Sequence, residues 1–449
     1  MGRLFGTDGV RGVANSELTA DLAFRLGQAG ALVLTKHCDG APKILVGKDT
    51  RVSGDMLEAG LVAGFCSVGA QVVCVGTIPT PAVAHLVRKY KMDAGVVISA
   101  SHNSMEYNGI KFFDSLGYKL SDDIESEIEE YILDGKPIGE LPIGAGVGKV
   151  SRIDTGKRDY VDFIKSTVKG NFAGMKIAVD CANGAAYECA KLVFKELGAE
   201  VILLNNVPNG VNINDNCGST HMEGLQKFVL EYGCNFGLAL DGDADRLLAT
   251  DEAGNIVDGD KIMILCAMSL REKGMLKNNT VVATVMSNLG FYKALDGLGM
   301  SYEQTKVGDR YVLENMLENG YSIGGEQSGH IIFLDYNSTG DGLLTAVQLA
   351  SALRDSGKSM SEFADFIKIY PQVLVNAKIK NEYKSTYMND ADIAAAIDKI
   401  EKKFAGNGRV LIRPSGTEPL VRVMLEGSDM EELRADATEL AQLMEQRLN

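Results

Sequence analysis

Short apolar runs and helical patterns alternate along most of the chain in one repeated order. A run of β-branched residues is followed by a turn, a helical pattern, a glycine and a second apolar run, over residues 43–76, 176–206 and 280–308. Two strands separated by one helix form a right-handed crossover between parallel strands. The pattern therefore predicts an α/β fold with three similar domains, each built on a mixed, mainly parallel sheet.

Residues 371–449 follow a different pattern. Apolar strands over 373–380, 409–416 and 420–427 accompany a helical segment over 391–406 and a long C-terminal helix, which predicts a smaller α+β domain. We expect the last helix to begin at Ser428, with Glu431 three residues later completing a capping box. The predicted domains are 1–152, 153–254, 255–370 and 371–449.

The composition is that of a soluble globular protein and argues against several kinds of partner. Of the 449 residues, 45% are apolar and 23% are charged. The net charge is −15 and no Lys/Arg-rich block occurs, so we expect no nucleic-acid partner. No apolar run approaches the ~20 residues that span a bilayer, so we expect no membrane partner. A small phosphorylated ligand fits, because a few arginines and backbone N–H groups can bind it whatever the net charge.

The cysteines and one acidic segment add little chemistry. The eight cysteines form no C-x-x-C pair, and the start of the chain has no apolar signal core. We therefore expect a reduced, cytoplasmic protein without a zinc or redox framework. The acidic run over residues 121–131 predicts a solvated helix face, and we assign it no function.

The strongest chemical signal is LALDGDADR, in which Asp241, Asp243 and Asp245 follow an apolar run at intervals of two residues. Carboxylates this close repel one another unless a hard cation such as Mg²⁺ neutralises them. An EF-hand is disfavoured, because Arg246 stands where its sharp turn needs glycine. A solvated turn stays open, as does an aspartyl phosphotransferase in which Asp241 itself is phosphorylated.

A second signal is the loop after the apolar strand that ends at Ile98. The chain there turns through Ser99–Asn103, and loops that follow strands of open α/β sheets bind ligands. The adjacent Ser101 and His102 suggest a hydrolase, but the chain has no G-x-S-x-G elbow. From these residues alone, a plain polar turn fits equally well.

Other segments hold side chains suited to phosphate or sugar. The segment RPSGTEPLVRV combines guanidinium groups, hydroxyls and backbone N–H groups, the donors that bind phosphate. The loop GGEQSGH places Glu326, Ser328 and His330 together, a set suited to sugar hydroxyls or proton transfer. The segments FGTDGVRG and TKVGDRYV carry Arg11 and Asp309, and either could be a simple turn.

Five of these segments occur in the order of the α-D-phosphohexomutase family, which the chain resembles along nearly its whole length: FGTDGVRG, SASHN, DGDADR, GEQSGH and RPSGTEP. Gln327 in GEQSGH, where glucose and mannose phosphate mutases usually carry Met, favours the branch that acts on glucosamine phosphate. The sequence departs from the family at Ser104, where proline is common. The resemblance implies four domains around a central cleft and, as the family's usual state, a homodimer.

The resemblance also implies an activity, the interconversion of glucosamine 6-phosphate and glucosamine 1-phosphate through a bisphosphate intermediate. This isomerisation would feed UDP-N-acetylglucosamine and cell-wall precursor synthesis. Ser101 would be carried as phosphoserine, which activity requires, and would complete the site of one Mg²⁺ held by Asp241, Asp243 and Asp245. A glucose or mannose phosphate mutase of the same family is the alternative, and an aspartyl-phosphate phosphatase is a remote one.

The family's roles can be placed on matching residues of this sequence. Glu326 and Ser328 would hold the sugar hydroxyls. Lys111 and His330 are the candidates for proton transfer, while His102 lies beside Ser101 in the catalytic loop. Positive charge near the transferred group would come from Arg11 and Arg246. The phosphate that does not react would be bound by Arg413, Ser415, Gly416, Thr417 and Arg422.

Overall fold

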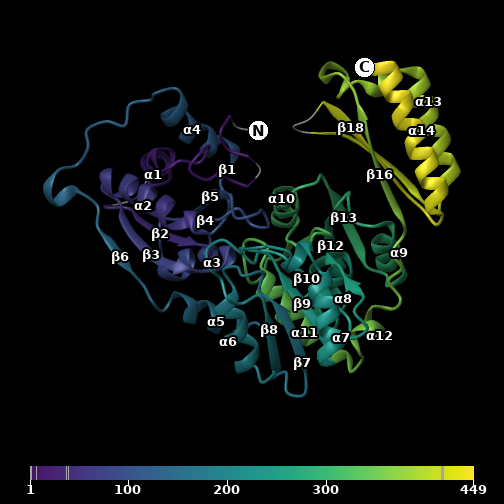
Figure 1. Cartoon of the computed structure of the whole chain (residues 1–449), viewed down its shortest axis with the longest axis horizontal. Helices are drawn as coiled ribbons and strands as arrows, with labels where there is room; N and C mark the ends of the chain where they lie inside the picture. The colour runs from purple at the N-terminus through teal and green to yellow at the C-terminus, as the bar shows by residue number, and fades with distance from the viewer. Residues whose placement is uncertain (1–2, 7, 37, 39, 416–418) are drawn as a thin grey trace. The chain divides into compact units, whose positions relative to one another are not determined.

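The computed structural model describes residues 3–6, 8–36, 38, 40–415 and 419–449, which form two compact units. The first unit extends to Met286 and resumes over Met300–Asp365, and the second comprises Ser287–Gly299 and Phe366–Asn449. Three sheets belong to the first unit and one to the second, in the chain order that Figure 1 shows by colour. Each unit is described by itself.

The first sheet has six strands in the order β1-β5-β4-β2-β3-β6. Strands β4, β2, β3 and β6 are parallel, and β5 runs antiparallel to both of its neighbours, β4 and β1. Every residue of β4 is buried, as expected of a parallel strand covered on both faces. Helices α1 and α2 pack against each other, and Leu26, Leu61 and Phe65 enter the core from them.

The strands of this sheet are β1 Val10–Val13, β2 Lys43–Lys48, β3 Gln71–Thr77, β4 Ala94–Ile98, β5 Tyr107–Asp114 and β6 Val150–Arg152. Its helices are α1 Ala20–Leu34, α2 Ser53–Ser67, α3 Thr80–Tyr90 and α4 Asp122–Leu133, and α5 Gly156–Ser166 follows β6. Helix α4 contains the acidic run, and the prediction of a solvated face is wrong for Glu129, which is 2% exposed. Its carboxylate accepts backbone N–H groups from the N-terminal segment, which offsets the cost of burying it.

The second sheet has the order β11-β10-β9-β7-β8, with β8, β7 and β9 parallel. Strand β9 is buried at every residue and leads directly into the aspartate-rich loop, after which β10 returns antiparallel to it. The elements are β7 Lys176–Asp180, α6 Tyr187–Glu196, β8 Glu200–Leu204, α7 Glu223–Tyr232, β9 Phe236–Leu240, β10 Leu247–Thr250 and β11 Ile256–Val257.

The third sheet has the order β13-β12-β14-β15, in which only β15 is antiparallel to its neighbour. Its central strand β12 is fully buried, whereas the polar strand β13 forms an edge. The elements are α8 Gly259–Glu272, β12 Thr280–Thr284, β13 Ser301–Thr305, α10 Asp309–Asn319, β14 Ile323–Gly325, β15 Ile331–Phe333, α11 Gly342–Ser356 and α12 Met360–Ala364.

The second unit is an antiparallel three-stranded sheet, β16-β18-β17, packed against helices. Helices α13 and α14 lie side by side and contact this sheet, as Figure 1 shows, and their apolar residues form its core. The elements are α9 Leu289–Gly297, β16 Gln372–Lys378, α13 Ala391–Phe404, β17 Arg409–Pro414, β18 Leu420–Glu426 and α14 Met430–Leu448. The antiparallel sheet with two helices confirms the predicted α+β organisation.

The three predicted crossovers are confirmed, because β2 with β3, β7 with β8, and β12 with β13 are parallel pairs joined by one helix each. The predicted start of the last helix is wrong. Its N-cap is Asp429, whose carboxylate accepts the N–H groups of Glu431 and Glu432, so Ser428 makes no capping box.

The remaining general features concern thiols and membranes. All eight cysteines, each within the described part of the chain, are free thiols, and six of them are buried. Burial raises the pKa of Cys266 to about 12, so its sulfur behaves as a small apolar group. Among the helices of the described residues, none has the length and apolar character needed to cross a bilayer.

Candidate active site

The serine loop and the aspartate-rich loop meet in the first unit, although they follow strands of different sheets. Ser101 lies three residues beyond the end of β4, and Asp241 directly follows β9. The Ser101 hydroxyl donates to Asp241 Oδ2 at 2.6 Å, and both side chains are buried. The two strongest signals of the sequence therefore form one site.

The three aspartates present their carboxylates to a common centre. One oxygen from each of Asp241, Asp243 and Asp245 lies within 4.8 Å of the other two. Thr80 Oγ1 donates to Asp243 Oδ2 at 2.7 Å, and the N–H of Arg246 donates to Asp241 Oδ1 at 3.2 Å. Burial, followed by repulsion from Asp245 and Asp243, raises the pKa of Asp241 well above its ordinary value.

The donor set of this cluster fits a hard divalent cation. Asp243 Oδ1 and Asp245 Oδ1 are buried and accept no hydrogen bond from the described residues. Unpartnered buried carboxylate oxygens are costly, and oxygen-only ligands with few protein groups are the habit of Mg²⁺. Asp241, Asp243 and Asp245 are thus the residues that could hold the predicted metal.

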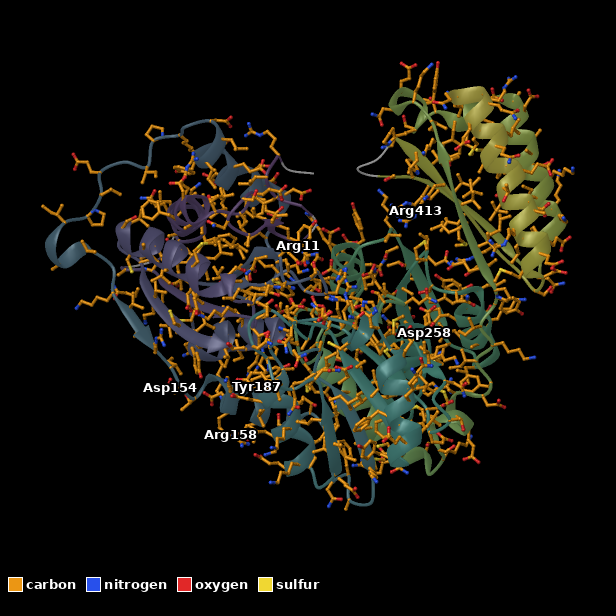
Figure 2. All side chains as sticks on the ribbon, in the orientation of Figure 1. Arg11, Asp154, Arg158, Tyr187, Asp258 and Arg413 are labelled. Atoms are coloured by element: carbon orange, nitrogen blue, oxygen red, sulfur yellow. The ribbon has the colours of Figure 1, made fainter. Side chains whose placement is uncertain are left out.

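Positive charge surrounds the cluster. Lys111, buried on β5, places Nζ 2.9 Å from Asp243 Oδ2 and 2.8 Å from Asp8 Oδ2. Burial alone would lower the pKa of Lys111, but the carboxylates of Asp243 and Asp8 raise it, so the ammonium stays charged. Arg11 lies on β1, beside β5, and its guanidinium bonds Asp8. Figure 2 labels Arg11.

Two guanidinium nitrogens near the cluster are buried without a hydrogen bond. Arg11 Nε and Arg246 Nε donate none within the described residues, and Arg246 Nε forms a long ion pair with Asp245 Oδ1 at 3.8 Å. Burial tends to lower the pKa of Arg246, yet Asp245 and Asp241 raise it. Guanidinium groups with N–H donors not used in hydrogen bonds are suited to binding a phosphoryl group.

The two histidines of the candidate loops have different surroundings. His102 Nδ1 lies 3.5 Å from Ser101 Oγ, and burial together with Arg246 and Arg11 lowers the pKa of His102. His330 is buried, with Nδ1 3.6 Å from Asp245 Oδ2 and Nε2 3.4 Å from Asp309 Oδ2. Burial would lower the pKa of His330, but Asp245 and Asp309 raise it.

The loop after β14 carries the candidate sugar contacts. Glu326 is half-buried and accepts the N–H of Gly308 at 3.2 Å through Oε1, while Ser328 is exposed. Gln327 donates to Asp258 Oδ2 at 3.2 Å and so ties this loop to the residue that caps α8. The loop therefore leaves a carboxylate and a hydroxyl available to a polar ligand.

The candidate phosphate loop belongs to the second unit, where Figure 2 labels Arg413. Arg413 on β17 faces Arg422 on β18 in register, and Ser415 is buried with its N–H bonded to Leu420 O at 2.9 Å. Burial and the neighbouring Arg422 lower the pKa of Arg413, because desolvation and a like charge both disfavour its charged form. The predicted contacts Gly416 and Thr417 lie outside the described residues.

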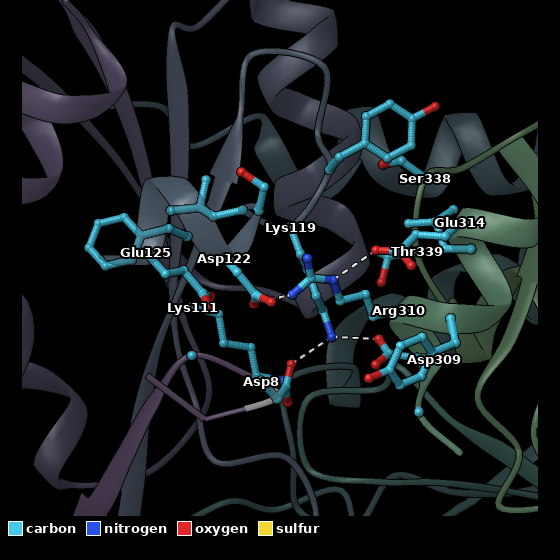
Figure 3. A pocket seen from close by; sticks show the side chains of 18 of the residues that line it. Asp8, Lys111, Lys119, Asp122, Glu125, Asp309, Arg310, Glu314, Ser338 and Thr339 are labelled. Atoms are coloured by element: carbon cyan, nitrogen blue, oxygen red, sulfur yellow. Dashed lines mark hydrogen bonds and ion pairs between the residues drawn. The ribbon is translucent and has the colours of Figure 1, made fainter. Parts of the chain in front are cut away.

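A pocket of about 260 Å³ in the first unit is lined in part by the charged side chains of Asp8, Lys111 and Lys119 (Figure 3). Lys119 Nζ bridges Asp8 Oδ1 and Asp309 Oδ2 at 2.6 Å each along its wall. Arg310 bonds Asp122 and reaches Glu314 Oε1 at 2.9 Å. Since Asp8 also contacts Lys111 and Asp309 contacts His330, the pocket wall is joined to both proton-transfer candidates.

Comparisons with known proteins identify the family of the chain. Models of the phosphoglucomutase/phosphomannomutase family match four consecutive regions: domain I over residues 2–137, domain II over 158–254, domain III over 258–370 and the C-terminal domain over 374–443. The chain belongs to this family. It is therefore a mutase, an isomerase of the phosphohexomutase class, and the predicted resemblance and fold class are confirmed.

Relatives of full length are similar to the chain throughout. The phosphoglucosamine mutase of Acetivibrio thermocellus is 60% identical over 448 residues, and that of Clostridium novyi is 60% identical over 449, each covering 100% of both chains. A phosphoglucomutase/phosphomannomutase family protein of Burkholderia thailandensis has the same fold, with a TM-score of 0.83 at 24% identity over 99% of this chain and 98% of that one.

A solved structure at lower similarity contains ligands. It is the Aspergillus fumigatus N-acetylphosphoglucosamine mutase in complex with GlcNAc-6P and magnesium. Its TM-score to this chain is 0.69 at 18% identity, over 99% of this chain and 96% of the other. At this identity the likeness shows the phosphohexomutase fold alone.

Several residues in and around the candidate active site of this chain were not predicted from the sequence to have a function. Lys119 and Asp8 were given no function, and a simple turn was left open for the segment with Asp309, yet the three form one half-buried ionic bridge. Asp49 and Arg51 were also given no function. The signal available was KDTR, charged residues directly after an apolar parallel strand, where ligand loops of α/β sheets lie.

Proposed function

We propose that the chain is a phosphoglucosamine mutase, which interconverts glucosamine 6-phosphate and glucosamine 1-phosphate through a phosphoserine at Ser101. The observation that carries this proposal is the buried contact of Ser101 Oγ with Asp241, inside a cluster of three carboxylates that Lys111 and Arg246 approach with positive charge. The sugar is inferred from Gln327 and from the full-length relatives with this name. The cytoplasmic location and the homodimer stay predictions.

The residues around Ser101 suit phosphoryl transfer. Arg11 and Arg246 would donate to the phosphoryl oxygens and stabilise the charge that develops on them during transfer. One Mg²⁺, held by Asp241, Asp243 and Asp245 with the Ser101 phosphate, would act as a Lewis acid on that group. The chain's own contribution is to hold the serine oxygen still, exclude water and keep these cations in place.

Proton transfer and substrate binding use the remaining groups. Lys111 and His330 are the candidates to move a proton at the sugar hydroxyl that gains or loses the phosphoryl group, with His102 beside Ser101. Glu326 and Ser328 would bind the sugar hydroxyls. The phosphate that does not react would be bound by Arg413, Ser415, Gly416, Thr417 and Arg422.

Phosphate on Ser101 is the decisive measurement. Intact mass and peptide mapping should find one phosphate on the Ser101 peptide after incubation with a hexosamine bisphosphate, and Ser101→Ala should abolish both the label and turnover. Removal of the metal with a chelator should stop turnover and added Mg²⁺ should restore it. Reproducible absence of label on Ser101 would refute the mutase mechanism, whereas a label that Asp241→Asn removes and Ser101→Ala leaves would support an aspartyl-phosphate phosphatase.

The choice of sugar is tested separately. The kcat/KM for glucosamine 6-phosphate should exceed that for glucose 6-phosphate and mannose 6-phosphate under the same conditions. A higher value for either neutral sugar would favour the alternative, a phosphoglucomutase or phosphomannomutase of the same family.

A further inference from the structure

Ser101 has a backbone conformation that needs support from its surroundings. Its φ is +53°, in the left-handed region that residues with a Cβ rarely adopt. A non-glycine residue held there persists only where neighbouring groups determine its position. The serine also lies in a loop, which has no sheet ladder to satisfy its backbone groups.

Arg51 supplies most of this support. The side chains of Arg51 and Asp49 are 0% exposed, and Arg51 Nε donates to Asp49 Oδ2 at 2.9 Å. Three of the remaining N–H groups of the guanidinium reach backbone carbonyls of the serine loop, which belong to Ser101 at 3.1 Å, Asn103 at 2.8 Å and Ser104. The fourth reaches the carbonyl of Tyr107 at 3.0 Å, where the loop enters β5. All five donors of one planar group are therefore used, four of them on this loop and its junction with β5.

Asp49 extends the support to the N–H of the nucleophile. Asp49 Oδ2 accepts the hydroxyl of Ser99 at 2.6 Å, and Ser99 Oγ in turn accepts the N–H of Ser101 at 3.0 Å. Asn214 Nδ2 donates to the carbonyls of Ser101 and Asn103 at 2.8 and 2.9 Å. Both backbone groups of Ser101 are thus bonded to buried side chains.

Stability alone does not account for this arrangement. A buried ion pair contributes little net stability, because desolvation opposes the attraction, and an apolar replacement of similar volume is often as stable. A planar, pre-organised guanidinium is suited instead to fixing several acceptors in one geometry. Its acceptors here are clustered on the loop that carries Ser101.

We propose that Arg51 is a positioning residue that holds Ser101 Oγ in line for phosphoryl transfer, with Asp49 and Ser99 as its supports. This inference rests on the proposed function of Ser101 as the phosphoryl carrier. Arg51 does not touch the reacting atoms and acts through the loop backbone.

The main test is Arg51→Lys in the full-length protein. Lysine keeps the charge beside Asp49 but has one ammonium in place of the fork, so it cannot reach all four carbonyls. We expect kcat to fall on the order of 100-fold, since a displacement of about 1 Å has that effect, with KM nearly unchanged. Amide hydrogen exchange should accelerate in the peptide covering residues 99–107 and not elsewhere.

Arg88→Lys is the matched control. Arg88 is another arginine of the first unit that bonds backbone and side-chain oxygens, half-buried where Arg51 is fully buried. It bonds Ala84 O and Asn337 Oδ1, away from the serine loop. The Arg88→Lys substitution should leave kcat unchanged. Arg51→Lys with wild-type kcat, or with faster exchange spread over the whole first unit, would overturn the proposal.

Ser99→Ala is a second variant in case Arg51→Lys does not fold. It removes one oxygen and cuts the link from Asp49 to the N–H of Ser101. We expect kcat to fall about 10-fold, the effect of roughly 1.4 kcal/mol, again with KM nearly unchanged. Wild-type kcat in this variant would contradict the proposal.

The failure of this inference is distinguishable from that of the proposed function. If Ser101 does not carry phosphate, the unmodified protein itself acquires no label from a hexosamine bisphosphate. If only the positioning role is wrong, the unmodified protein and Arg51→Lys both acquire the label and turn over equally fast.

Discussion

At the scale of single residues, the contact between the serine loop and the aspartate-rich loop depends on a glycine, which has no side chain. Gly242, between Asp241 and Asp243, lies so close to the serine loop that a Cβ built on it would be 2.6 Å from the carbonyl oxygen of Ser101. The same atom would be 2.8 Å from Nδ2 of Asn214. Because Arg51 and Asn214 both hydrogen-bond the carbonyl of Ser101, this carbonyl cannot move away without losing those bonds, so position 242 requires glycine.

Gly242→Ala should therefore separate the loops. We expect turnover to fall on the order of 100-fold or more, because Ser101 Oγ and the carboxylates would be displaced by about 1 Å. Steady-state kinetics measure this change. Gly224→Ala is the control, since Gly224 lies near the start of α7 with open space around its Cα. It should leave turnover unchanged and raise the free energy of unfolding by up to about 1 kcal/mol.

At the scale of secondary structure elements, α4 anchors the segment that supplies Asp8 and Arg11. Glu129 on α4 is buried and accepts the backbone N–H groups of Arg3, Leu4 and Phe5 at 3.0, 2.6 and 2.9 Å. This segment leads directly into β1, which pairs with β5 and brings Arg11 to the site. One carboxylate of an acidic helix thus attaches the N-terminal segment to the first sheet.

Glu129→Gln should loosen that attachment. Its amide cannot accept all three N–H groups, so we expect the free energy of unfolding to fall by about 1–3 kcal/mol at pH 7. The exposed neighbour Glu130 provides the control, and Glu130→Gln should change stability by less than about 0.5 kcal/mol. Urea titrations of the three proteins measure these differences.

The same carboxylate gives a pH dependence with a defined sign. Burial alone would raise the pKa of Glu129, but hydrogen bonds from the N–H groups of Phe5, Arg3 and Leu4 lower that pKa below its ordinary 4.5. A lowered pKa contributes stability that is complete above that ordinary value and is lost as the pH falls through the folded value. The difference between the unmodified protein and Glu129→Gln should therefore shrink below pH 4.5, and a constant difference would contradict this assignment.

At the scale of the whole molecule, the second unit is assembled from two distant segments of chain. Glu426 on β18 is 0% exposed and accepts the N–H of Leu289 at 3.1 Å, an amide N–H of Asn288 at 3.2 Å and the guanidinium of Arg409. Asn288 also bonds the N–H and C=O of Tyr370, at 2.9 Å each. Helix α9, which lies between β12 and β13 in sequence, folds with the C-terminal sheet.

Glu426→Gln should release α9 from that sheet. Removing the carboxylate leaves buried donors without a full partner, which costs about 1–3 kcal/mol. We expect amide exchange across residues 289–297 to accelerate about 10-fold or more, as measured by mass spectrometry. Glu432→Gln on α14, at an exposed ion pair with Lys403, should leave α9 unchanged. Unchanged exchange of α9 in Glu426→Gln would show that other contacts hold it.

Local pattern predicted the elements better than it predicted their ends and partners. The crossovers were predicted because strand and helix periodicities are encoded within each segment. The capping box at Ser428 was wrong because Asp429, one residue on, offers a carboxylate that accepts two N–H groups. The solvated face of α4 was wrong at Glu129, since its partners lie more than 120 residues earlier in the chain. The catalytic and binding roles of the site residues stay predictions.

The sequence by itself determined the three crossovers, the α+β end of the chain, and the loops in which Ser101 and the three aspartates follow buried strands. Each of these features is set by neighbouring residues. Only the tertiary structure decided that Lys119 bridges Asp8 and Asp309, that Arg51 holds the serine loop, and that α9 folds with the C-terminal sheet. These contacts join segments far apart in sequence, and they exist because packing buries charged groups that must then find partners.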